Sequence, residues 1–122
     1  MSLKRSLLEK VKSLYTFLPK LFPGYIGKIF SVESAEKLIV IDEINTSYGK
    51  IKYYCLGLIT LMRSQTLFTK EPETIEWIDN MDDNDIFWDI GSNVGLYSIY
   101  AGKKGMNVFA FEPSALNTFF IS

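Results

Sequence analysis

Hydrophobic side chains recur every three or four positions near the start of the chain, and charged side chains fall mainly between them. This spacing predicts an amphipathic helix over residues 3–22, which Pro23 and Gly24 end. We expect its apolar stripe to pack on the flank of a domain; a basic helix in weak contact with a membrane surface is the alternative. The stripe consists of Leu3, Leu7, Leu8, Val11, Leu14, Tyr15, Leu18 and Leu21.

The next part of the chain predicts a small β-hairpin. Residues 38–41 are the apolar run Leu-Ile-Val-Ile, which indicates a short strand. Residues 45–49 have the composition of a turn, and residues 50–55 alternate well enough for a second strand. We therefore expect two paired strands ahead of the main sheet.

Two helices are expected after the hairpin. The first covers residues 57–68 and carries Arg63 on its polar side. The second begins at Pro72, since proline is tolerated in the first turn of a helix, and ends near Asn80. Residues 82–85 then form an acidic turn, which we interpret as a solvated loop because an EF-hand calcium site needs a longer run of ligands.

The last third of the chain has the pattern of a strand–helix–strand unit. Residues 86–90 form a nearly continuous apolar run, typical of a parallel strand buried on both faces. A helix is expected over residues 94–104, because two lysines and then a glycine close its last turn. A second strand follows over residues 107–111, and Ser114 caps a further helix. Such a connection predicts a right-handed βαβ unit.

These elements divide the chain into three segments. We expect a basic amphipathic helix over residues 1–30, a hairpin with a helical lead-in over residues 31–84, and the start of a larger α/β domain over residues 85–122. The first segment carries six lysine or arginine side chains and one glutamate, whereas the rest of the chain is acidic. A basic N-terminal segment followed by an acidic remainder of the chain does not indicate a nucleic-acid-binding protein.

Composition removes further classes of protein. The single cysteine, Cys55, excludes an internal disulfide framework, and we expect it to be a small buried hydrophobe. The chain has no histidine, the commonest general base and metal ligand, and we expect no metal site. No apolar run approaches the roughly 20 residues of a membrane span, and no signal peptide is recognisable. We therefore expect a cytoplasmic protein without a transmembrane segment.

The connection between the strand at 86–90 and the helix at 94–104 contains candidate ligand-binding residues. Gly91 and Gly95 flank this turn, where glycine lets the backbone bend sharply and lets a ligand approach closely. Asn93 either caps the following helix or donates to a ligand. Asp89 ends an otherwise apolar strand and needs a partner, for which the cationic amino group of a methionyl moiety is suitable.

Glu112 stands at the carboxyl end of the second strand, 21 positions after Gly91. Its two carboxylate oxygens can accept hydrogen bonds from both hydroxyls of a ribose. Together with the glycine turn, it predicts half of a nucleoside-binding site. The dinucleotide pattern needs glycines where this chain has Asn93 and Leu96. S-adenosylmethionine has no phosphate to bind there, so the spacing favours S-adenosylmethionine.

Several short motifs combine in the second half of the chain. They are Glu-Pro-Glu-Thr at 71–74, Trp-Ile-Asp at 77–79, Asp-Ile-Gly-Ser-Asn-Val-Gly-Leu-Tyr-Ser at 89–98 and Phe-Glu-Pro-Ser-Ala-Leu-Asn at 111–117. The segment that contains them resembles the FkbM family of S-adenosylmethionine-dependent methyltransferases. The resemblance implies a Rossmann-like class I methyltransferase fold and O-methylation of a sugar or other small-molecule hydroxyl. By position, it assigns cofactor binding to Asp89, Gly91, Ser92, Asn93, Gly95 and Glu112.

The family's sheet has seven strands, and this chain supplies the first two, so we expect an incomplete catalytic domain. No residue of the chain is a convincing catalytic base. The partner that the resemblance implies is a small-molecule or glycan acceptor. Two alternatives stay open, a non-catalytic binding fragment and another nucleoside-binding Rossmann protein such as an oxidoreductase.

Overall fold

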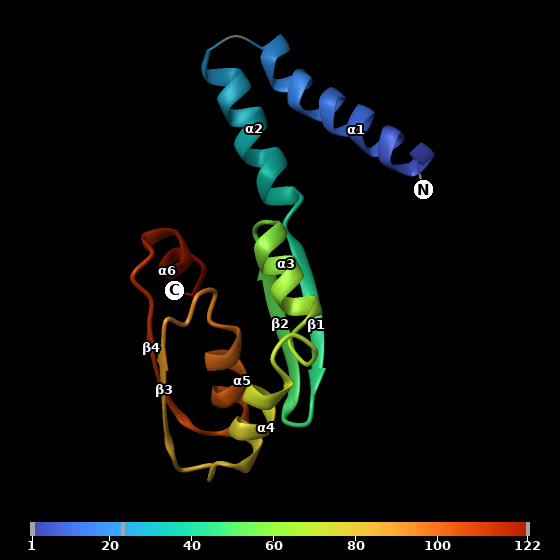
Figure 1. Ribbon diagram of the computed structural model, residues 1–122. Coiled ribbons are helices and arrows are strands. Elements are labelled where there is room, and N and C mark those ends of the chain that lie inside the picture. The colour runs from blue at the N-terminus through green and yellow to red at the C-terminus, as the bar shows by residue number, and fades with distance from the viewer. Residues whose placement is uncertain (1, 23, 122) are drawn as a thin grey trace. The chain divides into compact units, whose positions relative to one another are not determined.

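The computed structural model of the chain has a mixed α/β fold (Figure 1). The described residues form two compact units, Met1–Ile39 and Val40–Ser122. The boundary expected at residue 30 falls inside the first unit, and the boundary expected at residue 84 falls inside the second. The structure describes the backbone of residues 2–22 and 24–121 and the side chains of residues 6–22 and 24–118.

The first unit opens with helix α1 (Ser2–Phe17) and the 3-10 turn η1 (Leu18–Leu21). The prediction of one helix over residues 3–22 is therefore wrong at its C-terminal end. Pro19 explains the break, because proline has no backbone N–H to donate and its ring clashes with the preceding turn of an α-helix. The short 3-10 turn accommodates this proline near its start.

A second helix, α2 (Tyr25–Lys37), was not predicted. Its apolar residues form no continuous stripe, so hydrophobic periodicity does not reveal it. Gly27 is buried in this helix, and a Cβ atom there would overlap the carbonyl oxygens of Phe22 and Pro19. Glycine is normally unfavourable inside a helix, but here it lets α2 approach η1 closely.

The apolar stripe of α1 stays largely exposed. Leu7, Val11 and Leu14 each keep more than half of their surface accessible to solvent. Within the described part of this unit, α2 packs on η1 rather than along α1. Among the described residues, no helix has both the length and the apolar character that crossing a bilayer requires.

The second unit begins with an antiparallel hairpin of strands β1 (Val40–Thr46) and β2 (Gly49–Cys55). The predicted second strand is confirmed, and alternate residues of it are buried. The first strand was placed wrongly at 38–41. Residues 42–46 are mostly polar, and they become a strand because they pair with β2. The buried residues of β2 are Ile51, Tyr53 and Cys55.

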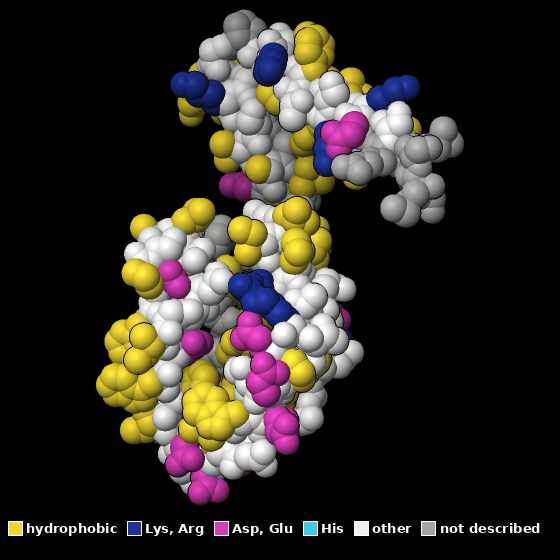
Figure 2. Space-filling view, viewed as in Figure 1, with side chains coloured by type: hydrophobic (Ala, Val, Ile, Leu, Met, Phe, Trp, Pro, Cys, Tyr) yellow, Lys and Arg dark blue, Asp and Glu magenta, His cyan; other side chains and the backbone are white. Residues whose placement is uncertain are grey.

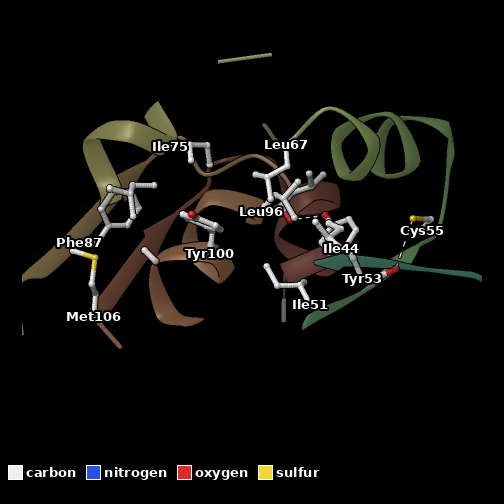
Figure 3. Packing of buried hydrophobic residues seen from close by; sticks show 13 residues of the cluster. Ile44, Ile51, Tyr53, Cys55, Leu67, Ile75, Phe87, Leu96, Tyr100 and Met106 are labelled. Atoms are coloured by element: carbon white, nitrogen blue, oxygen red, sulfur yellow. Dashed lines mark hydrogen bonds between the residues drawn. The ribbon is translucent and has the colours of Figure 1, made fainter. Parts of the chain in front are cut away.

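Helices α3 (Leu58–Gln65) and α4 (Pro72–Asn80) follow the hairpin, as predicted, although α3 ends earlier than expected. They contribute to one hydrophobic core with β1, β2 and the C-terminal elements of the unit (Figure 3). Ile51, Ile78 and Tyr100 are almost completely buried in this core. Burying side chains of this size stabilises a fold by about 1.5–3 kcal/mol each.

Strands β3 (Ile86–Ile90) and β4 (Asn107–Phe111) form a parallel pair, which helix α5 (Leu96–Lys104) connects. The predicted strand–helix–strand unit is present, with α5 starting two residues later than expected. Helix α6 (Ala115–Ile121) follows β4. The Ser114 hydroxyl accepts an amide hydrogen bond at its start (3.4 Å), as predicted for a cap.

Strand β3 is not buried on both faces, contrary to the prediction from its apolar run. Phe87 points into the core and is 3% exposed, whereas Trp88 and Ile90 are 59% and 79% exposed. Phe109 and Phe111 share this outer face, with ring centroids 5.8 and 5.5 Å from Trp88. Apolar side chains accordingly gather on the surface over β3 and β4 (Figure 2). Within the described residues, the sheet is covered on one face.

Lys104 closes the C-terminal end of α4. Its ammonium group donates to the carbonyl oxygens of Ile78 (2.9 Å), Asp79 (2.7 Å) and Met81, and its side chain is 4% exposed. The last carbonyls of a helix have no intrahelical donor and carry partial negative charge. The buried cation therefore satisfies acceptors that would otherwise be unpaired.

The side chain of Asp79 extends this polar contact to the hairpin. Its Oδ1 atom accepts hydrogen bonds from the hydroxyls of Tyr48 (3.0 Å) and Tyr100 (2.8 Å). Tyr48 lies in the hairpin turn and Tyr100 lies in α5, so one carboxylate links three elements. Burial is the main cause that raises the pKa of both hydroxyls, which keeps them protonated as donors.

We predict that Lys104→Met destabilises the fold, because it leaves the carbonyl groups at the end of α4 without a donor. The expected loss is about 1–3 kcal/mol of unfolding free energy, measured by urea denaturation. The control is Lys103→Met on the exposed neighbour, for which we expect a change within about 0.5 kcal/mol. Equal effects of the two substitutions would contradict the assigned role.

Candidate functional site

The candidate site lies at the carboxyl ends of β3 and β4. After Ile90 the chain bends sharply, and the amides of Gly91 and Ser92 both donate to the carbonyl oxygen of Phe111 (2.8 and 3.1 Å). The Gly95 amide donates to the Ser92 carbonyl oxygen (2.8 Å). The backbone of the bend, residues 91–95, is thus anchored to the last residue of β4.

Three residues of the bend have positive φ angles: Gly91 (87°), Asn93 (53°) and Gly95 (72°). Glycine adopts this conformation at no steric cost, and asparagine tolerates it better than most residues. The predicted sharp turn at the two glycines is confirmed. No described atom lies within 4 Å of the position that a Cβ atom of Gly91 would take, so the bend is open at this point.

Helix α5 begins at Leu96, with Gly95 as its N-cap and no side-chain capping bond. Of the two roles that the sequence left open for Asn93, capping the helix is therefore wrong. The first amides of α5 have no carbonyl partner within the helix. They are donors at the same end of the sheet as the bend.

Glu112 reaches from the end of β4 to the bend. Its Oε2 atom accepts a hydrogen bond from the Asn93 amide (2.7 Å), and its Oε1 atom accepts one from the Ser114 amide (2.7 Å). The structure thus brings the strand-end carboxylate and the glycine bend into direct contact. Each carboxylate oxygen offers about two acceptor positions, so one position on each oxygen remains for a ligand hydroxyl.

Asp89 lies at the end of β3, beside the start of α5. Its Oδ2 atom accepts a hydrogen bond from the Ser98 hydroxyl (2.5 Å). Sequence analysis required a partner for this carboxylate but did not identify Ser98. Among the described residues, the Oδ1 atom of Asp89 receives no hydrogen bond, and it remains able to accept one from a cationic ligand.

A cleft of about 140 Å³ opens beside the bend. Gly95 and Glu112 lie outside its lining. The Ser92 hydroxyl is buried and has no hydrogen-bond partner among the described residues. Leaving such a group unpaired costs about 1–3 kcal/mol. The predicted site residues that line the cleft are Asp89, Gly91, Ser92 and Asn93.

Besides the apolar Val94 and Leu96, sequence analysis missed four polar or charged residues of the cleft. They are Arg63 in the last turn of α3, Lys70 and Glu71 before α4, and Tyr97 in the first turn of α5. Arg63 and Lys70 are the only basic residues between positions 53 and 102, a feature that could have identified them. Lys70 pairs with Glu71 (2.6 Å), whereas Arg63 forms no ion pair with a described acidic side chain.

These charges influence one another. The hydrogen bond from Lys70 is the main cause that lowers the pKa of the Glu71 carboxyl. Burial, followed by the nearby charge of Glu71, raises the pKa of the Tyr97 hydroxyl. The cleft is therefore lined by acidic side chains, Glu71 and Asp89, and by the basic side chains of Arg63 and Lys70. The raised pKa keeps the Tyr97 hydroxyl neutral.

The hairpin supports the bend from the side of the core. The Tyr53 hydroxyl donates to the carbonyl oxygen of Val94 (2.7 Å), and the Tyr53 side chain is buried (Figure 3). Burial raises the pKa of Tyr53 to about 12. The bond needs the protonated hydroxyl as its donor, so the same burial that raises the pKa preserves the contact.

A segment of 37 residues in the chain is similar to the hexuronic acid methyltransferase AglP of Haloferax volcanii, with 40% identity. The match covers 30% of this chain and 15% of that protein. No protein-family model matches the chain, and no solved structure gives a significant match. The similarity is thus to a methyltransferase, over a short part of each protein.

We predict that Asn93→Gly keeps the fold and that Asn93→Val destabilises it. The positive φ of this residue is natural for glycine but strained for a β-branched side chain. The expected change in unfolding free energy is less than about 1 kcal/mol for glycine and about 1–3 kcal/mol for valine. Denaturant unfolding of the two variants measures it, and equal stability of both would show that the bend is not strained.

We predict that alkaline pH weakens the fold through Tyr53. Its pKa is about 12 in the folded chain against an ordinary value of 10.0, so the unfolded chain loses the phenolic proton first. The stabilisation is complete below pH 10 and is lost as the pH rises toward 12. Thermal unfolding across this range should show the decline, and Tyr53→Phe should reduce its slope. An unchanged slope in that variant would contradict the assignment.

Proposed function

We propose that this chain is the cofactor-binding part of an S-adenosylmethionine-dependent methyltransferase of the FkbM type, with a partial Rossmann-like class I fold. The observation that carries the proposal is the contact between Glu112, at the end of β4, and the bend that follows β3. A ribose held by the carboxylate would place its nucleoside beside the bend. The short similarity to a methyltransferase supports the same class.

The residues present suit this cofactor. Glu112 keeps acceptor positions for two ribose hydroxyls, and Gly91 leaves room for close approach of a ligand. The unpaired hydroxyl of Ser92 and the free oxygen of Asp89 provide polar contacts for the methionyl end. Asn93 and Gly95 give the bend its shape. We assign these six residues to cofactor binding.

S-adenosylmethionine supplies an electrophilic methyl group, so the protein's own task is to align donor and acceptor and to exclude water. The relative is named for hexuronic acid, and this supports a sugar hydroxyl, free or in a glycan, as the acceptor. We assign no catalytic base, because the two carboxyl groups near the bend, Asp89 and Glu112, are assigned to cofactor contacts.

Two other functions make different predictions. A dinucleotide-binding protein needs close approach of a pyrophosphate to the backbone, and the Asn93 side chain at the middle of the bend opposes it. Such a protein would bind NAD in preference to S-adenosylmethionine. A non-catalytic binding fragment would bind the methyl donor and transfer no methyl group to any sugar.

The test is titration calorimetry of the chain with S-adenosylmethionine and, separately, with NAD. We expect binding of S-adenosylmethionine and a 10- to 100-fold loss in Glu112→Gln, since a hydrogen bond to a charged group contributes about 1.5–3 kcal/mol. The matched control is Glu76→Gln, an exposed residue of α4 outside the cleft, which should bind normally. Preference for NAD, or equal loss in both variants, would refute the proposal. A sugar methylation assay then separates an enzyme from a binding fragment.

A further inference from the structure

The described part of the first unit, Met1–Ile39, contains no buried apolar side chain. Its helices α1 and α2, of 16 and 13 residues, are short. Short helices are marginally stable in water, and packing of an apolar face normally supplies most of their stability. This unit therefore lacks the cover that its apolar side chains need. Those that expose more than half of their surface include Leu7, Val11 and Leu14 of α1 and Tyr25, Ile26 and Val32 of α2.

Lysines flank the apolar stripe of α1 on both sides. Lys10 and Lys12 precede and follow Val11, near the middle of the stripe, so they lie about 100° to either side of it. Glu9 lies about 160° from Val11, on the opposite side of the helix. Its ion pair with Lys12 (3.0 Å) is exposed, and such pairs contribute little free energy. Both lysines therefore stay available to an anionic partner.

The first unit also differs from the second in the sign of its charge. Residues 1–32 carry six lysine or arginine side chains and one glutamate, whereas residues 40–122 carry six basic and eleven acidic side chains. Apolar and basic side chains lie beside one another on the surface of the first unit (Figure 2). An anionic surface would accordingly attract the first unit and repel the second.

We propose that the first unit binds the surface of an anionic lipid bilayer, with the apolar stripe of α1 inserted between the lipids. Basic amphipathic helices bind such surfaces in the plane of the interface, and lysine side chains extend to the headgroups. Tyr15 and Tyr25 carry an apolar ring and a polar hydroxyl, which suits the same interface. Lipids also adapt to the apolar side chains of α2, which form no continuous stripe.

Other partners fit these features less well. In a dimer formed through the stripe, Lys10 and Lys12 of both copies would flank one contact, and their like charges would repel. A protein groove that receives a helix needs the apolar anchors on one face, and α2 does not provide such a face. The inference does not depend on the proposed function, because no methyl donor takes part in it.

The test is sedimentation of the full chain with lipid vesicles. One set contains phosphatidylglycerol and phosphatidylcholine in equal amounts, and the other contains phosphatidylcholine alone. We expect binding to the mixed vesicles that weakens as the salt concentration rises, because salt screens the attraction of the lysines. Binding to phosphatidylcholine alone should be at least about tenfold weaker.

The double variant Lys10→Gln/Lys12→Gln tests the electrostatic part. It should bind the mixed vesicles about 10- to 30-fold more weakly, since each lysine near an anionic surface contributes about a factor of five. The matched control is Lys52→Gln/Lys103→Gln, which removes two exposed lysines of the second unit and should bind normally.

The double variant Leu7→Gln/Leu14→Gln tests insertion. It should bind the mixed vesicles at least about tenfold more weakly, because two leucines no longer enter the lipid. Both side chains are exposed, so the midpoint of urea unfolding should not change. The matched control is Leu58→Gln/Ile59→Gln, which replaces two exposed apolar side chains of α3 and should bind normally.

Several outcomes would overturn the inference. Equal binding to both kinds of vesicle would remove the role of charge, and normal binding by Leu7→Gln/Leu14→Gln would remove the role of insertion. Self-association in analytical ultracentrifugation that this leucine variant abolishes would assign the stripe to a second copy. A lowered urea midpoint in the same variant would show that the chain itself covers the stripe. Each of these outcomes leaves the proposed function unaffected.

Discussion

The carbonyl oxygen of Phe111 is the constraint on which the site depends. It is the last acceptor of β4, and the amides of Gly91 and Ser92 both donate to it. Because both amides have this one carbonyl as their acceptor, the chain leaving β3 bends across the end of β4. Parallel pairing in the observed register sets the two strand ends level with each other. The residue after Phe111 therefore meets the bend, and that residue is Glu112.

A two-stranded sheet is a poor scaffold by itself, and the hairpin compensates for this. Tyr53 of β2 holds the bend through the Val94 carbonyl, and Ile51 packs in the same core as Tyr100 of α5. At the other end of the unit, Asp79 joins the hairpin turn to α5 through two tyrosine hydroxyls. The hairpin and the parallel unit are therefore one body, which explains why the boundary expected between them at residue 84 lies inside a compact unit.

The sequence predicted the elements that form because of residue patterns within their own segment. The βαβ unit, β2 and α4 followed from periodicity and turn residues, and the glycine bend followed from the need for positive φ angles.

The extent of β1 could not be predicted from the sequence, because its polar residues are held by pairing with β2. Helix α2 depends on Gly27 packing against η1. Pro19 was present in the sequence and should have ended the first helix. Arg63 joins the cleft only because α3 folds back beside the bend, a tertiary effect that no local spacing encodes.

In the second unit, polar groups with hydrogen-bond partners and polar groups without them lie in different places. The amides of Gly91, Ser92 and Gly95, the last carbonyls of α4 and the hydroxyls of Tyr53 and Tyr100 all have partners. The Ser92 hydroxyl and the Arg63 guanidinium have none within the described chain, and both line the same cleft. Stability alone would favour an apolar residue at position 92, because replacing an unpaired buried hydroxyl costs nothing and removes a penalty. Unpaired groups that converge on one cleft are therefore better explained by a ligand than by the needs of the fold.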